Sequence, residues 1–313
     1  MVPTESRNSG VPNPAGDLPT TSEPVDHPLG DLGVYGLRID APSGYVDATL
    51  LVTAPESWPT WHIRWEQLAD GPLAADAIVE SWSGDHAVLR AQPSGFITVD
   101  RVASRTTLHL DEPPTPATLL HPYLASTAVV AGHWLGRAPF HAGAFAAGGR
   151  AWGILGNREM GKSSLLMSLH RAGVTVLADD VLVVDGDTVY SGPRCLDLRR
   201  SAAERFDGGT YLGVVGTRER WRVTLPPAPP QVPFGGWILL AWTEEVEIGS
   251  VDASTKLRAL VTNCGLTAPG VPTPGLLDLL AYPMVRLGRP QSWDRADEAL
   301  EQLLEAIGGL SVG

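Results

Sequence analysis

The sequence contains almost no lysine. Of its 23 Lys and Arg residues only Lys162 and Lys256 are lysines, so 21 positions (23 − 2) carry arginine. A lysine ammonium is a compact point charge that suits a crowded phosphate, whereas the guanidinium of arginine is a broad planar fork. In a chain that uses arginine for nearly every cation, the position of a lysine is informative. Lys162 lies in a glycine-containing loop.

Cysteine and long apolar segments are also scarce. Cys195 and Cys264 are too few for a disulfide framework, and their spacing does not fit a zinc site. The chain has no run of about 18 apolar residues, and its amino terminus lacks a basic segment followed by an apolar one. We therefore expect a cytoplasmic protein that neither crosses nor binds a membrane.

The chain is short of positive charge overall. Its formal net charge is −12 and its sequence pI is near 5.1, which argues against a broad surface for nucleic acid or anionic lipid. A local basic pocket is still compatible with this balance. The 313 residues, 43% of them hydrophobic, have room for one large domain or two ordinary ones, and we expect two.

Composition divides the chain into four segments. Residues 1–30 are rich in Pro, Ser, Thr, Gly and Asp, which predicts a disordered or loosely docked tail. Short alternating stretches between turn residues predict a small β-rich amino-terminal domain over residues 31–112. A linking helix is expected over 113–137, and a second, α/β domain over 138–313.

We interpret the tryptophans of the first domain as core rather than as a stacking surface for a ligand: Trp58, Trp61, Trp65 and Trp82.

The linking helix is expected as a helical stretch from about Pro116 to Leu135. Its apolar residues recur at helical spacing, and Gly136 follows as a stop signal. These apolar residues are Leu119, Leu120, Tyr123 and Leu124, with Thr127 on the same face.

Apolar runs and turn residues predict the elements of the second domain. Strands are expected at 139–147, 150–155, 174–178, 181–184, 188–190, 196–198, 211–215, 220–225, 237–242 and 283–287. Helices are expected at 163–171, 253–264, 274–281 and 292–307. The dipeptide Gly148-Gly149 between the first two strands is a hairpin signal.

The strongest motif is a phosphate-binding loop. Gly156, Gly161, Lys162 and Ser163 satisfy G-x-x-x-x-G-K-[ST], in which backbone N–H groups surround phosphates, the Lys reaches the terminal ones and the hydroxyl contacts Mg²⁺. The motif follows an apolar run and precedes a helical stretch, the context that it requires. The predicted nucleotide-binding residues are Gly156, Asn157, Arg158, Glu159, Met160, Gly161, Lys162, Ser163 and Ser164.

Two carboxylates and a histidine accompany this loop. Asp179 and Asp180 follow an apolar run, 17 and 18 residues after Lys162, at the strand end where open α/β sheets place ligands. Adjacent residues on a strand face opposite ways, so one carboxylate is expected to meet a metal and the other an acceptor. A turn or capping role is the alternative. His141 lies 21 residues before Lys162, and a single histidine is by itself more often structural.

The stretch 141–180 resembles the HPr kinase family. It contains HAGAF, GNREMGKSS, HRAG and VLADD in the order and at the spacing of that family. Weaker similarity, in Phe140–Phe145 and in YSGPRCL at 190–196, extends to HPr-kinase-like proteins of lasso peptide pathways. The resemblance implies a phosphate-loop kinase domain of the HPr kinase/phosphoenolpyruvate carboxykinase type, and transfer of a phosphoryl group from ATP to a Ser hydroxyl.

Roles for individual residues follow from the resemblance. It implies that Lys162 and Ser163 hold phosphates and Mg²⁺, that Asp179 is the base, that Asp180 supports the metal, and that His141 lies beside the base. Two arginines, Arg194 and Arg220, are expected either to contact phosphate or acceptor or to be simply solvated. The resemblance also implies a homo-oligomer.

The loop departs from the family pattern. Asn157, Arg158, Glu159 and Met160 stand where relatives usually have Ser-Gly-x-Gly, so that Arg158 either adds a phosphate contact or pairs with Glu159. No Glu-Ile-Arg-Gly signature follows, and HPr is therefore not the expected acceptor. We predict an ATP- and Mg²⁺-dependent kinase that acts on a Ser of a peptide or protein. A small-molecule hydroxyl kinase and a non-catalytic nucleotide-binding scaffold are the alternatives.

Overall fold

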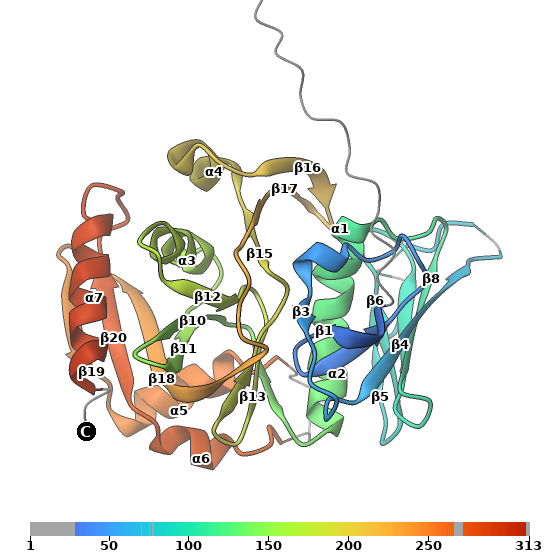
Figure 1. Ribbon diagram of the computed structural model, residues 1–313, viewed down its shortest axis with the longest axis horizontal. Coiled ribbons are helices and arrows are strands. Elements are labelled where there is room, and N and C mark those ends of the chain that lie inside the picture. The colour runs from blue at the N-terminus through green and yellow to red at the C-terminus, as the bar shows by residue number, and fades with distance from the viewer. Residues whose placement is uncertain (1–28, 70, 75, 77, 266–271, 311–313) are drawn as a thin grey trace, which may run out of the picture.

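The chain folds into a mixed α/β structure with three sheets. The computed structural model describes residues 29–69, 71–74, 76, 78–265 and 272–310, so the predicted tail lies almost entirely outside the described residues. Sheets of eight and nine strands stand on either side of the helix that links them, and a three-stranded sheet lies near both (Figure 1). In the described part of the chain, no helix is long and apolar enough to cross a membrane.

The eight-stranded sheet comes from the amino-terminal part of the chain. Its order is β3-β1-β2-β4-β8-β7-β6-β5. The strands are β1 (Leu32–Val34), β2 (Leu37–Asp40), β3 (Val52–Thr53), β4 (Thr60–Gln67), β5 (Ser81–Trp82), β6 (His86–Arg90), β7 (Phe96–Asp100) and β8 (Arg105–Leu110). Trp58 and Trp61 are buried, and Trp65 and Trp82 pack against the same cluster. The interpretation of these tryptophans as core residues is therefore confirmed.

The linking helix is broken, contrary to the prediction. It consists of α1 (Pro116–Thr118), a wide turn over Leu119–Leu124 and α2 (Ala125–Trp134). His121 has φ −145° and ψ 123°, which is extended rather than helical backbone. The next residue, Pro122, explains this, because proline disfavours the helical conformation of the residue before it and has no N–H to donate. His121 consequently leaves the course of the helix.

The nine-stranded sheet holds the phosphate loop. Its path is β12-β10-β11-β18-β14-β13-β9, and β20 pairs with β18 and β19. The strands are β9 (Ala138–Phe140), β10 (Gly143–Ala147), β11 (Arg150–Leu155), β12 (Thr175–Ala178), β13 (Leu182–Asp185), β14 (Thr188–Tyr190), β18 (Gln231–Trp242), β19 (Glu247–Ser250) and β20 (Met284–Arg289). The predicted Gly-Gly hairpin joins β10 to β11.

Strand direction brings the functional loops to one edge of this sheet. Strands β11, β18 and β20 are mutually parallel. Strand β12 also runs in their direction, because both β11 and β12 pair antiparallel with β10, which separates them. The phosphate loop after β11 and the carboxylates after β12 therefore emerge at the same edge.

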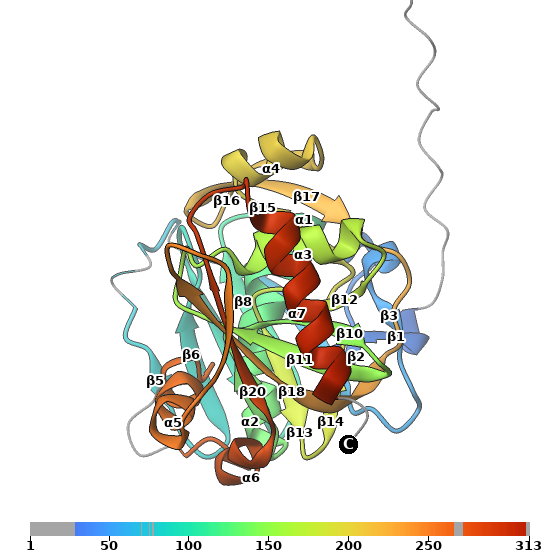
Figure 2. The same cartoon turned by 90° about the vertical axis from the view of Figure 1, so that its left-hand side faces the viewer.

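Helices cover both faces of the sheet. One hydrophobic cluster includes α3 (Lys162–Arg171) and α7 (Ala296–Leu310), whereas another includes α5 (Ala253–Thr262) and α6 (Leu276–Ala281). Figure 2 shows α7 lying across the sheet, on the face away from α5 and α6. The predicted helices are thus present, with shifted ends.

The third sheet has the order β15-β17-β16. It is formed by β15 (Cys195–Leu198), β16 (Thr210–Val215) and β17 (Arg218–Thr224), and α4 (Arg200–Phe206) follows β15. Neither α4 nor β19 was predicted.

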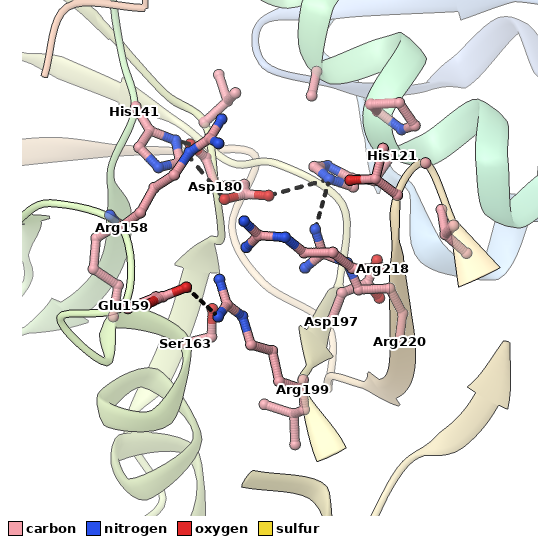
Figure 3. A pocket seen from close by; sticks show the side chains of 18 of the residues that line it. His121, His141, Arg158, Glu159, Ser163, Asp180, Asp197, Arg199, Arg218 and Arg220 are labelled. Atoms are coloured by element: carbon pink, nitrogen blue, oxygen red, sulfur yellow. Dashed lines mark hydrogen bonds and ion pairs between the residues drawn. The ribbon is translucent and has the colours of Figure 1, made fainter. Parts of the chain in front are cut away.

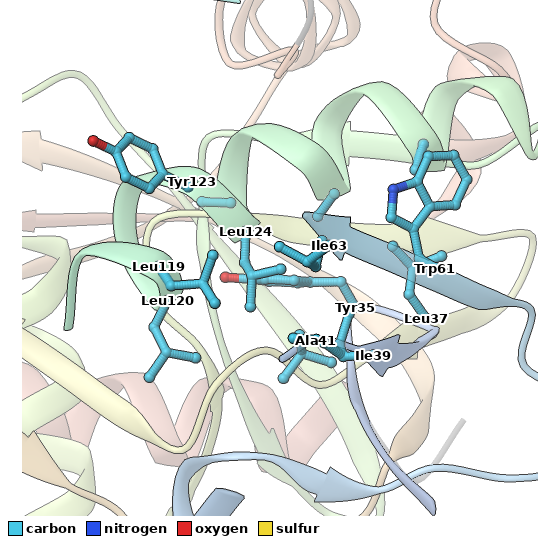
Figure 4. Packing of buried hydrophobic residues seen from close by; sticks show 14 of the residues in the cluster. Tyr35, Leu37, Ile39, Ala41, Trp61, Ile63, Leu119, Leu120, Tyr123 and Leu124 are labelled. Carbon is cyan, nitrogen blue, oxygen red and sulfur yellow. The ribbon is translucent and has the colours of Figure 1, made fainter. Parts of the chain in front are cut away.

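A continuous core joins the first sheet to the rest of the molecule. Tyr35 and Leu37 pack with Leu119 and Leu124 of the broken helix (Figure 4). The same cluster reaches Val183 in β13. The amino-terminal sheet is therefore packed against the second unit and helps to form the pocket described next.

Candidate active site

The phosphate loop connects β11 to α3 in a conformation that requires glycine. Gly161 precedes α3 with φ 77°, and a Cβ built there would lie 2.5 Å from Nη2 of Arg289. That guanidinium donates to the carbonyl oxygens of Met160 and Gly161, both at 3.0 Å. Because α3 has no side-chain cap at its amino end, its first N–H groups are free to bind an anion.

The unusual residues of the loop engage a partner outside it. The carboxylate of Glu159 pairs with Arg199 at 2.9 Å, and this exposed interaction lowers the pKa of Glu159. Arg158 lines the pocket. Among the described residues no carboxylate pairs with Arg158, so the alternative of an Arg158–Glu159 pair is wrong.

Lys162 is held against the loop itself. Its Nζ donates to the carbonyl oxygen of Gly156 at 2.6 Å and to that of Asn157 at 3.5 Å. Burial lowers the pKa of Lys162, while Asp180 and Asp179 oppose the shift. The only lysine of the motif thus lies between the loop carbonyls and the carboxylate pair.

Asp179 lies against the phosphate loop. Its Oδ1 accepts hydrogen bonds from the Ser163 hydroxyl and from the N–H of Asp180, both at 3.0 Å. Desolvation and the charge of Asp180 raise the pKa of Asp179 to about 7, although the Ser163 hydrogen bond acts in the opposite direction. The side chain does not line the pocket.

Asp180 faces the pocket. It has φ 67°, a left-handed conformation that Asp adopts more readily than most residues. Its Oδ2 lies 3.2 Å from Nε2 of His121, and its Oδ1 lies 3.8 Å from Nδ1 of His141 (Figure 3). Burial alone would raise the pKa of Asp180, but the positive charge of His121, His141, Arg220 and Lys162 holds it below the usual value.

The two histidines come from opposite sides of the pocket. His141 lies between β9 and β10, and its Nδ1 is 3.0 Å from the carbonyl oxygen of Asp180. His121 comes from the break in the linking helix and was missed by sequence reasoning. Burial lowers the pKa of both histidines. The His-Pro dipeptide inside a predicted helix was the available signal, because it marks a side chain displaced from the helical course.

The wall opposite the phosphate loop is rich in arginine. Arg218 and Arg220 on β17 both line the pocket, and an Nη of Arg220 lies 3.5 Å from Nε2 of His121. Asp197 also lines the pocket, where the guanidinium of Arg222 binds both of its oxygens at 2.7 Å. Sequence reasoning missed Asp197, Arg199 and Arg218, although arginine alternates along the sequence RERWR.

These groups surround a pocket of about 730 Å³. Its lining includes part of the phosphate loop together with residues of the broken helix and of the β17 hairpin. The structure brings together these predicted site residues as lining: Asn157, Arg158, Glu159, Gly161, Lys162, Ser163, Ser164, His141, Asp180 and Arg220. Gly156 and Met160 lie in the same loop, but they do not line the pocket.

Arg194 lies outside the pocket, contrary to the prediction. Its Nε donates to the carbonyl oxygen of Leu51 at 3.2 Å, and its Nη2 donates to that of Thr49. The side chain therefore binds the backbone of the first unit and does not line the pocket. The expected contact with phosphate or acceptor is wrong for Arg194, because two of its donors bind backbone carbonyls outside the pocket.

The oxygen atoms behind the loop suit Mg²⁺ bound together with a nucleotide. Ser163 and Asp179 supply a hydroxyl and a carboxylate within hydrogen-bond distance of each other. Mg²⁺ prefers oxygen ligands and is commonly held by one or two carboxylates together with substrate phosphates. In the described residues, no three His, Cys, Asp or Glu side chains form a metal site by themselves.

Comparison with known proteins gives little support for a particular family or fold. No protein-family model and no curated protein matches the chain. Among solved structures, the Hpr(Ser) kinase/phosphatase from Coxiella burnetii aligns over 56% of this chain and 99% of its own, with 14% identity and a TM-score of 0.29. A TM-score this low does not establish a shared fold.

Proposed function

We propose that this protein is an ATP- and Mg²⁺-dependent phosphotransferase whose acceptor is a hydroxyl, namely a Ser of a peptide or protein. One observation carries the proposal: the hydroxyl of the phosphate-loop residue Ser163 bonds to Asp179, while the next residue, Asp180, faces the pocket. A phosphate-binding element and a pocket-facing carboxylate thus meet at one strand edge. Phosphoryl transfer needs little more from a protein than such positioning and charge stabilisation.

The geometry favours reversing the roles first expected for the two carboxylates. Asp179 bonds to Ser163 and does not line the pocket, so these two side chains would hold Mg²⁺. Bound Mg²⁺ neutralises charge on the phosphates. Asp180, which is oriented by His121 and His141, would act as the base toward the acceptor.

The proposed transfer is a balanced reaction in which these residues supply the proton acceptor and the ligands of the phosphates. The acceptor oxygen forms a bond to the γ-phosphorus, the bond between that phosphorus and the β,γ-bridging oxygen breaks, and ADP leaves. The hydroxyl proton passes to Asp180, whose lowered pKa keeps it ionised at neutral pH. Lys162 and the first N–H groups of α3 stabilise the phosphate charge.

A transfer assay tests the proposal. Wild-type protein, Lys162→Ala and Asp180→Asn are incubated with γ-labelled ATP, Mg²⁺ and a library of Ser-containing peptides, and the products are identified by mass spectrometry. We expect labelled phosphoserine with wild-type protein and a loss of at least about 100-fold in either variant. Unchanged transfer in both variants would refute the assignment.

The same assay separates the two alternatives. Label on a small hydroxyl compound, with none on any peptide, would identify a small-molecule kinase. Thermal stabilisation by ATP without transfer to any acceptor would identify a non-catalytic nucleotide-binding module.

A further inference from the structure

Three arginines form a row on one face of β17. Arg218, Arg220 and Arg222 occupy every second position of the strand, so their side chains leave it on the same side. Second neighbours on a strand lie about 7 Å apart. We call these residues the arginine row. Like charges at this spacing repel one another unless anions lie between them.

Among the described residues, only the inner member of the arginine row is hydrogen-bonded to a carboxylate. Arg222 binds both oxygens of Asp197 at 2.7 Å. Arg220 makes one side-chain hydrogen bond to the described residues, 3.5 Å to Nε2 of His121, and its buried Nε has no hydrogen-bond partner among them. Within the described part of the chain, Arg218 has no ion-pair partner. Two of the three cations thus face the pocket without a hydrogen-bonded carboxylate, and the nearest carboxylates that act on them are Asp180 and Glu159.

Arg220 lies beyond Asp180 as seen from the phosphate loop, whereas Arg218 reaches from the same strand toward Glu159. Lys162 and Ser163 are on one side of Asp180 and His121 is on the other, 3.2 Å from its Oδ2. Arg220 follows His121 at 3.5 Å. Figure 3 shows the guanidinium of Arg220 beside His121 and that of Arg218 beneath Asp180, toward Arg199 and Glu159. A base must lie between the phosphate and the acceptor, so this far side of the pocket is the acceptor side.

The nucleotide already has its own cations. Lys162, Arg158 and the first N–H groups of α3 surround the loop in which phosphates bind. The chain as a whole carries a net charge of −12, so free cations on the opposite wall are not a general property of its surface. Arg218 and Arg220 are partly buried. A cation without a hydrogen-bonded anion is costly in such a position, and a ligand that brings an anion reduces this cost.

We infer that Arg218 and Arg220 bind an anionic group of the acceptor, a carboxylate or a phosphate close to the hydroxyl that receives the phosphoryl group. The planar guanidinium matches both anions with paired hydrogen bonds. The anion comes either from an acidic side chain beside a Ser in a peptide or from a small hydroxy acid. This inference rests on the proposed function for the identity of the ligand as acceptor.

A titration tests the anion site separately from transfer. Protein saturated with Mg²⁺ and a non-hydrolysable ATP analogue is titrated with inorganic phosphate in a calorimeter. We expect one phosphate per chain, and binding at least about tenfold weaker in Arg218→Gln/Arg220→Gln. Affinity for the nucleotide analogue should change by less than about threefold.

The matched control is Arg200→Gln. Arg200 lies on the neighbouring helix α4, pairs with Glu219 and does not line the pocket, so its removal changes the charge without touching the site. We expect it to bind phosphate like the wild type. No phosphate binding to nucleotide-saturated protein would overturn the inference, as would an equal loss of nucleotide and phosphate affinity in the double variant.

A second assay distinguishes the sources of the anion. Transfer is compared for Ser peptides with a neighbouring Asp or Glu, for the same peptides with Asn or Gln, and for free serine as a small hydroxy acid. We expect wild-type protein to favour one of the carboxylate-bearing acceptors through KM, and Arg220→Gln to lose that preference. Equal KM values for acidic and amide peptides and no use of free serine would refute the anion site but leave the kinase assignment intact. Absence of transfer to any acceptor would count against the proposed function, while the phosphate titration would still decide on the site.

Discussion

The hydroxyl oxygen of Ser163 lies 3.0 Å from Oδ1 of Asp179, whereas the carboxylate of the next residue, Asp180, faces a different set of groups. Two adjacent carboxylates therefore have different surroundings. Ser163 occupies the hydroxyl position of a phosphate-loop motif. This contact divides the pair into one carboxylate that belongs to the phosphate loop and one that belongs to the acceptor side.

The division predicts different defects in two isosteric variants. Asp179→Asn should weaken the Mg²⁺ dependence of nucleotide binding, because the carboxylate beside Ser163 is lost. Asp180→Asn should retain nucleotide affinity within about threefold but lower kcat by at least about 100-fold, because it removes the base. Calorimetry with and without Mg²⁺, together with steady-state kinetics, measures both. The opposite pattern would restore the roles first expected from the family resemblance.

The pKa of Asp179 predicts how stability depends on pH in the nucleotide-free protein. A carboxyl whose pKa is raised to about 7 in the folded state stabilises the protein below its unfolded pKa, and this contribution disappears as pH rises through about 7. Asp179→Asn should therefore unfold at a higher temperature than the wild type at pH 8, by an amount equivalent to about 1–3 kcal/mol after solvent screening.

The adjacent residue provides the control for this prediction. The pKa of Asp180 is lowered in the folded protein, so its charge stabilises the fold at neutral pH and this contribution is lost as pH falls. Asp180→Asn should therefore lower the melting temperature at pH 8. Thermal melts from pH 5 to pH 8 without nucleotide measure both signs, and a parallel shift of both variants would contradict the separation.

Sequence reasoning located the loop side of the pocket better than the acceptor side. The phosphate loop and its two carboxylates lie within 25 residues of each other, from Gly156 to Asp180, so local spacing was sufficient to place them together. His121 and Arg218 come from distant parts of the chain, and only the packing of three sheets brings them to the same pocket. The predicted role of Arg194 was wrong for the same reason, because its hydrogen-bond partners Thr49 and Leu51 lie in another unit.

The break in the linking helix is a related failure. Apolar periodicity from Leu119 to Thr127 predicted a continuous helix, and most of those side chains are indeed buried in one cluster. Periodicity reports which face is buried, but it does not report a local change of backbone conformation. Pro122 was visible in the sequence, and its effect on the preceding residue was underestimated.

Replacing Pro122 tests whether this break serves the site. Pro122→Ala allows the helix to continue through His121 and should move the imidazole away from Asp180. We expect kcat to fall by about tenfold, as in His121→Ala, while KM for ATP stays unchanged. Pro116→Ala is the control, because Pro116 begins α1 after its Thr115 cap and does not line the pocket. Wild-type kcat in both pocket variants would show that His121 does not position the base.

The Asp197–Arg222 pair makes a prediction about stability rather than catalysis. Both side chains are less than one-tenth exposed, and the guanidinium also donates to the carbonyl oxygen of Ala117 in α1. Arg222→Met leaves Asp197 buried without its partner and should destabilise the fold by about 3–5 kcal/mol. The double variant Asp197→Leu/Arg222→Met removes both charges and should recover most of that loss. Chemical denaturation of the three variants measures the coupling. If Arg222→Met and the double variant were equally unstable, the cost would lie in lost packing against α1 and not in an unpaired charge.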